Sequence, residues 1–435
     1  APHALYRFMA ATLLRHHLGR ALVGDVSSGY FNKAVVARLA QPLDFRRMSG
    51  ESEYRQVLAK HYETLQRAWL TPVEIFQPHY AEAVGHSMLR RHRDTFGADA
   101  PLRICEVGGG TGTAAISLLH WLRRTSPHDY ERCSYVLLEP SALLAQVQME
   151  RLRGEGFNQE RARVIHAPMS GWREALGGRQ HGGWSLLLLE VLDNLPHDKL
   201  RHDIEAGVLL EAHVVKECSS ARAGSGVGGG TQWREELRPL TDPTLIRVAE
   251  LLDLDSPEGL DAFEATLLPG AGPSWLAGLQ QGLLSLTQDA GRTARSRDVY
   301  VPTGSYLLLS ELCGLFPDHH LTLADFSHWG PECSSVTAST SVNVPVVQSQ
   351  HDGATRDWRG DYLAAPFGEA DVMFSTSFEA LARLYADASH NRQPSISLST
   401  TEFMQRHADV RACATTSGYN PLIQDFVNTS VFLTI

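Results

Sequence analysis

A short apolar segment that runs directly into a glycine-rich turn limits the possible folds of this chain more than any other feature. Residues 102–107 are mostly apolar and include Glu106, and Gly108, Gly110 and Gly112 follow them. A segment with apolar residues at helical spacing begins at Thr113. Glycine is needed where the backbone takes positive φ or where a ligand approaches closely, and the start of a helix offers free N–H groups. The order predicts a strand, a tight turn and a helix, with a ligand site at the turn.

Further short apolar runs alternate with helix-like segments after this turn. They lie at residues 135–138, 163–166 and 185–189. Alternation of this kind is typical of a parallel sheet that helices cover on both faces. We therefore predict an α/β fold built on a Rossmann-like, doubly wound sheet.

The pattern divides the chain into four regions. Residues 1–100 read as a helical N-terminal region, with helices over 53–65 and 75–93, and residues 101–218 as the Rossmann-like core. Residues 219–300 read as an insertion: a flexible Gly/Ser-rich loop at 219–232, then a polar helical part. Residues 301–435 complete the core. They are expected to form a helix at 303–315, strands at 321–326 and 371–374, a helix at 377–388 and a terminal apolar run at 427–435, with a long connection at 327–365.

Composition and spacing exclude several classes of protein. The chain has 39 Lys and Arg against 49 Asp and Glu, so its net charge of −10 argues against a dedicated nucleic-acid binder. No apolar run approaches the roughly 18 residues of a membrane span. The six cysteines include no C-x₂-C pair and the 20 histidines no ligand spacing, so we expect no metal site.

The glycine spacing separates two classes of nucleotide site. It is G-x-G-x-G, one residue shorter than the dinucleotide fingerprint, and no lysine follows as in a P-loop. A nicotinamide-dependent enzyme is therefore disfavoured. Glu106 and the three glycines resemble motif I of class I S-adenosylmethionine-dependent methyltransferases. This resemblance implies S-adenosyl-L-methionine as the cofactor, the turn beneath its methionine part, and Glu139, at the end of the next strand, on its ribose hydroxyls.

Four other segments narrow the resemblance. Residues 190–196 (EVLDNLP) are similar to the E-F-F-D-A-L-P block of the MidA-like methyltransferases, residues 71–77 (TPVEIFQ) to their T-S-P-E-I-S-Q with Glu74 in register, and residues 323–326 (LADF) to a strand ending A-D-Y-G. Residues 28–31 (SGYF) resemble the G-Y-Y near the family's start. This family includes the mitochondrial protein arginine methyltransferase that assists respiratory complex I assembly.

The resemblance implies a protein arginine methyltransferase of the mitochondrial matrix, with a complex I subunit as its protein substrate. Its predicted cofactor-binding residues are Glu106, Gly108, Gly110, Gly112, Glu139 and Glu74. Glu190 and Asp193 are the predicted catalytic pair, because a carboxylate binds a guanidinium through two parallel hydrogen bonds. Two alternatives stay open: Asp193 as the N-cap of a following helix, and Glu74 as an acid favoured at a helix start.

Departures from the family pattern keep a second function open. The family turn is commonly G-P-G-R-G, whereas this chain has GGGTG, and residues 167–170 (APMS) offer no acid for an adenine amino group. A methyltransferase fold with little or no turnover, acting as an assembly factor or a structural subunit of a large organellar complex, is the alternative. The start of the chain bears Arg7, Arg15 and Arg20 and no acid before Asp25, which fits either the end of a transit peptide or an amphipathic helix.

Overall fold

The computed structural model describes residues 38–64, 70–217, 232–268, 296–329, 341–351, 354–358, 362–364, 370–391 and 394–435. The predictions for the start of the chain, for residues 28–31 and for most of the Gly/Ser-rich loop lie outside these residues.

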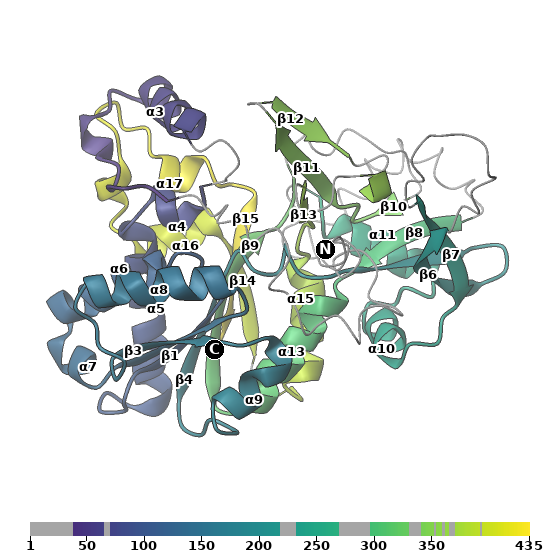
Figure 1. The fold of residues 1–435 in the computed structure, drawn as a ribbon, viewed down its shortest axis with the longest axis horizontal. Helices are drawn as coiled ribbons and strands as arrows, with labels where there is room; N and C mark the ends of the chain where they lie inside the picture. The colour runs from purple at the N-terminus through teal and green to yellow at the C-terminus, as the bar shows by residue number, and fades with distance from the viewer. Residues whose placement is uncertain are drawn as a thin grey trace, which may run out of the picture.

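A seven-stranded sheet forms the larger lobe (Figure 1), in the order β14-β15-β9-β4-β1-β2-β3. The five strands from β9 to β3 are parallel, and β15 pairs antiparallel with both β9 and the edge strand β14. This arrangement confirms the predicted α/β sheet. The strands are β1 Arg103–Val107, β2 Ser134–Glu139, β3 Ala162–His166, β4 Trp184–Leu189, β9 His319–Phe326, β14 Ser395–Ser399 and β15 Thr429–Thr434.

The central strands are apolar along their length because both faces of the sheet are buried. Successive side chains point to opposite faces, so Ile104 belongs to one hydrophobic core and Cys105 to the other. The first core contains apolar residues of α5 His79–Phe96 and α6 Thr113–Thr125. The second contains apolar residues of α13 Thr303–Leu315 and α15 Phe378–Ala388. Because the five central strands are parallel, their carboxyl ends lie at one shared edge of the sheet.

Shorter elements complete this lobe. A helix expected over 75–93 is divided into α4 Pro72–Ile75 and α5, because Pro78 has no N–H to continue a helix and caps α5 instead. The other elements are η3 Phe45–Arg47, α3 Glu51–Thr64, α7 Pro127–Glu131, α8 Ala142–Gly154, η4 Met169–Gly171, α9 Trp172–Ala175, α16 Thr400–His407, η6 Val410–Cys413 and α17 Pro421–Gln424.

A second lobe contains a five-stranded sheet in the order β10-β8-β5-β6-β7 (Figure 1). Its strands are β5 Asp198–Asp203, β6 Val208–Glu217, β7 Gln232–Pro239, β8 Ser296–Val301 and β10 Ser341–Val342, with α10 Pro243–Leu251 and α11 Pro257–Ala265 beside them. The prediction of a helical insertion over 219–300 is wrong at Gln232–Pro239, which is an edge strand, and at its end, where Ser296–Val301 is strand β8. Arg234, Glu236 and Arg238 form ion pairs along one side of β7, so pairing with β6 rather than apolar alternation decides its structure.

A small antiparallel sheet combines two strands from the expected long connection at 327–365 with the strand expected at 371–374. It has the order β12-β11-β13, formed by β11 Val346–His351, β12 Ala354–Asp357 and β13 Ala370–Met373, with η5 Tyr362–Ala364 between the last two. Val347 and Val372 pack with Phe374 and Tyr300 in a third, smaller core. In the part of the chain that the structure describes, no helix is long and apolar enough to cross a lipid bilayer.

Candidate cofactor and acceptor site

The glycine turn joins β1 to α6 and needs glycine at three positions. Gly108, Gly110 and Gly112 have φ of 66°, 53° and 84°, a region that residues with a Cβ adopt only at a cost. The N–H of Gly108 donates to the carbonyl of Leu138 at 3.0 Å, which ties the turn to the end of β2. The turn therefore presents bare backbone next to the first turn of α6.

Glu106 lies beneath this turn, in the interior. Its Oε2 accepts a hydrogen bond from the Tyr135 hydroxyl at 2.8 Å, and a Cβ on Gly109 would come within 3.1 Å of its Cδ. Burial raises the pKa of Glu106 to about 7. These contacts support the turn from below, and the predicted contact of Glu106 with the cofactor stays a prediction.

Glu139 ends β2, and Gln148 links its side chain to the glycine turn. Its Oε1 accepts the N–H of Ser141 at 2.9 Å, and its Oε2 accepts Nε2 of Gln148 at 2.9 Å. The same Nε2 donates to the carbonyl of Gly110 at 2.8 Å, so Gln148 bridges the two predicted elements of the site. Burial raises the pKa of Glu139 to about 7. Each carboxylate oxygen keeps a lone pair that could accept a hydroxyl donor.

Glu74 reaches the turn from α4. It occupies the first turn of that helix, as its alternative interpretation required, and its Oε1 also accepts the hydroxyls of Thr111 at 2.7 Å and Thr113 at 2.5 Å. The sequence did not indicate that Arg151 of α8 binds the same two threonines. Arg151 Nη1 donates to the carbonyl of Thr111 at 2.6 Å and to the two hydroxyls at 2.7 and 2.8 Å. The carbonyl and hydroxyl of Thr111 thus bind an arginine of α8.

Two polar atoms beside the turn are buried without a hydrogen-bond partner among the described residues. They are Oε2 of Glu74 and Oε1 of Gln148. A buried acceptor without a donor costs free energy, so such atoms indicate a missing donor. S-adenosylmethionine offers hydroxyl and amino donors, and the glycines leave the backbone of the turn without side chains. The residues present therefore fit this cofactor.

Glu190 follows β4 at the same edge of the sheet as the glycine turn. It is the residue after the strand, has φ of 54° and donates its N–H to the carbonyl of Ala324 at 2.8 Å. Its side chain is partly exposed, yet its Oε1 is buried without a partner among the described residues. Burial and the nearby charge of Asp325 raise the pKa of Glu190. A non-glycine residue held at positive φ beside a ligand site is a candidate functional residue.

Asp193 lies further into the interior than Glu190. It is 2% exposed and accepts a hydrogen bond from Nδ2 of Asn194 at 2.8 Å, while its carbonyl accepts the N–H of Phe374 at 2.9 Å. The next regular element is strand β5, so the alternative of an N-cap for a following helix is wrong. The predicted catalytic role of Asp193 stays a prediction.

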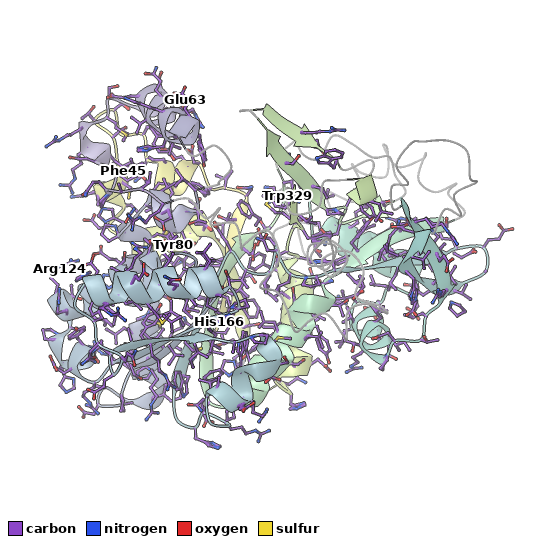
Figure 2. All side chains as sticks on the ribbon, viewed as in Figure 1. Phe45, Glu63, Tyr80, Arg124, His166 and Trp329 are labelled. Carbon is purple, nitrogen blue, oxygen red and sulfur yellow. The ribbon has the colours of Figure 1, made fainter. Side chains whose placement is uncertain are left out.

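Asp325 is a second residue that sequence reasoning did not assign to the site. It lies near the end of β9, is 1% exposed, and its Oδ2 accepts the N–H groups of Leu192 at 2.8 Å and Asp193 at 3.2 Å. Burial raises the pKa of Asp325 to about 7. Tyr80 of α5, labelled in Figure 2, is also buried here, and burial with the charges of Glu190 and Asp325 raises its pKa. The position of Asp325 in the A-D-Y-G-like segment was the available signal.

Comparisons with known proteins agree with this geometry. Residues 83–395 match the model of a family described as "putative S-adenosyl-L-methionine-dependent methyltransferase". No curated protein gives a significant match. A crystal structure of a methyl transferase-like superfamily member from Burkholderia thailandensis, bound to S-adenosyl-homocysteine, is 15% identical with a TM-score of 0.52, covering 100% of this chain and 94% of that one.

A native crystal structure of a superfamily protein from the same organism gives a TM-score of 0.51 at 15% identity, with 100% and 93% of the two chains covered. At this level of identity the two structures show the shared fold alone. The family match spans more than half of the chain. The chain therefore belongs to this family of S-adenosyl-L-methionine-dependent methyltransferases.

Proposed function

We propose that the chain methylates an arginine side chain of a protein, and that this protein is a subunit of respiratory complex I in the mitochondrial matrix. The arginine is supported by the acidic groups beside the glycine turn. The compartment and the complex are supported by the resemblance of residues 190–196, 71–77 and 323–326 to MidA-like methyltransferases.

The observation that carries the choice of arginine is a deficit of positive charge around Glu190. Among the described residues, no lysine or arginine forms an ion pair with Glu190 or Asp325, although burial and the charge of Asp325 raise the pKa of Glu190, and burial raises the pKa of Asp325. A buried carboxylate is stabilised by a cation that also donates hydrogen bonds. A guanidinium supplies both, through paired N–H groups that match a carboxylate.

The residues of the site then have distinct tasks. S-adenosylmethionine, when bound, supplies an electrophilic methyl group on a sulfonium. Glu190 would hold the guanidinium through Oε1, and its raised pKa suits it to receive the proton that the methylated nitrogen loses. Asp325 and Asp193 would fix the loop that carries Glu190. Transfer depends mainly on this alignment, because the enzyme forms no covalent bond to the acceptor.

A paired-peptide assay tests the proposal. The protein is incubated with methyl-labelled S-adenosylmethionine and peptides that differ only in one Arg or Lys. We expect label on the arginine peptide, and a loss of at least about tenfold in Glu190→Gln, as for removal of a charged hydrogen-bond partner. Glu63→Gln, an exposed position on α3, is the matched control (Figure 2). Equal labelling of the lysine peptide would contradict the choice of acceptor.

Two further measurements address turnover and compartment. Calorimetry that shows cofactor binding in a protein that labels neither peptide would instead support the assembly-factor alternative. Mass spectrometry of complex I subunits from cells with and without the protein should show an arginine methyl group that disappears with it. An unchanged methylation pattern would contradict the proposed substrate.

A further inference from the structure

A basic pocket lies between α5 and α16, away from the glycine turn. These two helices pack against each other, and the pocket between them has a volume of about 490 Å³. Leu89 gives it an apolar wall. The polar residues that line it are His86, Arg90, Arg93, Asp94, Arg406 and His407.

The cations of this pocket exceed the nearby acids. Arg93 is paired with the buried Asp129, but neither Arg90 nor Arg406 forms an ion pair among the described residues. Arg91, next to them and half-buried, donates to the carbonyls of Leu321 at 3.2 Å and Thr434 at 2.9 Å rather than to a carboxylate. The whole chain carries a net charge of −10, so this group of unpaired cations is opposite in sign to the charge of the chain as a whole.

His407 shows the effect of this crowding. Its pKa is lowered to about 4 by burial and by the positive charges of Arg90, Arg91 and Arg406, with His86 adding to them. Like charges held close together cost free energy that a bound anion would remove. Arg90 lies well before the end of α5 at Phe96, so an interaction with the helix C-terminus does not explain its position.

The pocket is separate from the methyltransferase site. Arg91 contacts Leu321 in the first half of β9, whereas Asp325 lies near the other end of that strand. Four residues of a strand span about 13 Å. The basic pocket therefore lies near the amino-terminal ends of the parallel strands, whereas the glycine turn lies at their carboxyl ends.

We propose that this pocket binds a small molecule that carries a phosphate group. Its volume falls within the range of small-molecule sites. Two unpaired guanidiniums match a phosphate monoester, which carries nearly two negative charges at neutral pH and accepts paired N–H donors. The apolar wall at Leu89 would contact the rest of the molecule.

Titration calorimetry at low salt, with inorganic phosphate and a nucleoside monophosphate as probes, tests the site. Arg90→Gln and Arg406→Gln should each weaken binding of both probes by about tenfold or more, the effect of losing one charged hydrogen bond. Arg153→Gln, an exposed last-turn arginine of α8, is the matched control and should bind as the wild type does. Binding should weaken as salt is raised.

A second readout does not depend on the choice of probe. Without any added anion, Arg90→Gln should unfold at a higher temperature than the wild type, because it removes a like charge, and added phosphate should stabilise the wild type more than the variant. Equal phosphate binding by the wild type and both pocket variants would overturn the proposal. Capture of an acidic peptide with no response to either phosphate probe would also overturn it, in favour of a protein-docking surface.

Discussion

The carboxylate of Asp325 accepts the backbone N–H of Leu192 at 2.8 Å and so fastens the loop after β4 to the end of β9. The same carboxylate accepts hydrogen bonds from the N–H groups of Asp193 and Phe326, at 3.2 and 2.8 Å. Glu190 begins the loop that these bonds hold, and its backbone is at positive φ. A buried acid that accepts several backbone donors thus maintains a strained residue at the acceptor side of the site.

Asp325→Asn should loosen this loop without changing the cofactor half of the site. In the variant, an amide NH2 would replace one of the carboxylate oxygens, which accept backbone N–H groups. A donor would then face a donor, so we expect a loss of roughly 1–3 kcal/mol in unfolding free energy. The methyl-transfer rate should fall, whereas the Kd for S-adenosylmethionine should stay close to that of the wild type. Urea unfolding, calorimetry and labelling rates measure the three quantities. Asp318→Asn, exposed just before β9, is the control, and a large rise in cofactor Kd would contradict the division of tasks.

Gly108→Ala tests whether bare backbone at the turn is needed for the cofactor. Gly156 is a matched position, since both residues have positive φ, of 66° and 80°, but an added Cβ at Gly156 meets nothing within 4 Å. At Gly108 it would lie 3.3 Å from Cγ2 of Val191. Each alanine should cost about 1–2 kcal/mol of stability through its backbone conformation. Only Gly108→Ala should also abolish the calorimetric signal of S-adenosylmethionine; equal affinities in the two variants would contradict a cofactor at the turn.

Much of this site follows from local patterns in the sequence. The runs of apolar residues predict the parallel strands, and the order of Glu106, the glycines and Glu139 predicts the turn and its neighbouring acid. Parallel strands place their carboxyl ends at one edge, so the proximity of Glu190 to the turn also follows from the sequence. These features depend on short stretches of chain whose physical preferences agree with the fold.

The remaining features depend on pairings between distant parts of the chain. Asp325 contacts Leu192 across 133 positions, and the family-like segments around the two residues do not by themselves pair them. Arg151 resembles an ordinary last-turn arginine of α8, yet it binds a threonine 40 positions earlier. The strand Gln232–Pro239 is rich in charge and lacks alternation, so only its partner β6 makes it a strand.

Glu106→Gln should change how stability depends on pH. Burial raises the pKa of Glu106 to about 7 from an ordinary 4.5, so ionising it in the folded protein is unfavourable. Its contribution to stability is complete below pH 4.5 and is lost as the pH rises through 7. The pKa difference corresponds to about 3 kcal/mol at most. Relative to the wild type, the variant should therefore gain stability between pH 5 and pH 8.

The measurement is the difference in urea unfolding free energy between variant and wild type at these two pH values. The difference between the two proteins is needed because other groups change the stability of both. Burial lowers the pKa of His197 to about 4, so the stability that this histidine contributes is lost as the pH falls below 6.5, the opposite direction to Glu106. Glu63→Gln, at an exposed position, should show no such trend. A difference for Glu106→Gln that stays constant with pH would show that Glu106 ionises normally.

Arg151→Met should reveal whether the network around Thr111 controls cofactor affinity. Methionine keeps much of the aliphatic stem but removes the donor shared by the Thr111 carbonyl and the hydroxyls of Thr111 and Thr113. Those acceptors, and the adjacent Glu74, would lose their cation, so we expect a fall in stability of about 1–3 kcal/mol. Because Thr111 lies inside the glycine turn, the Kd for S-adenosylmethionine should rise about tenfold. Arg153→Met, on the same helix turn but exposed, should leave both quantities unchanged. A variant that is less stable yet binds the cofactor as the wild type does would assign Arg151 to the fold alone.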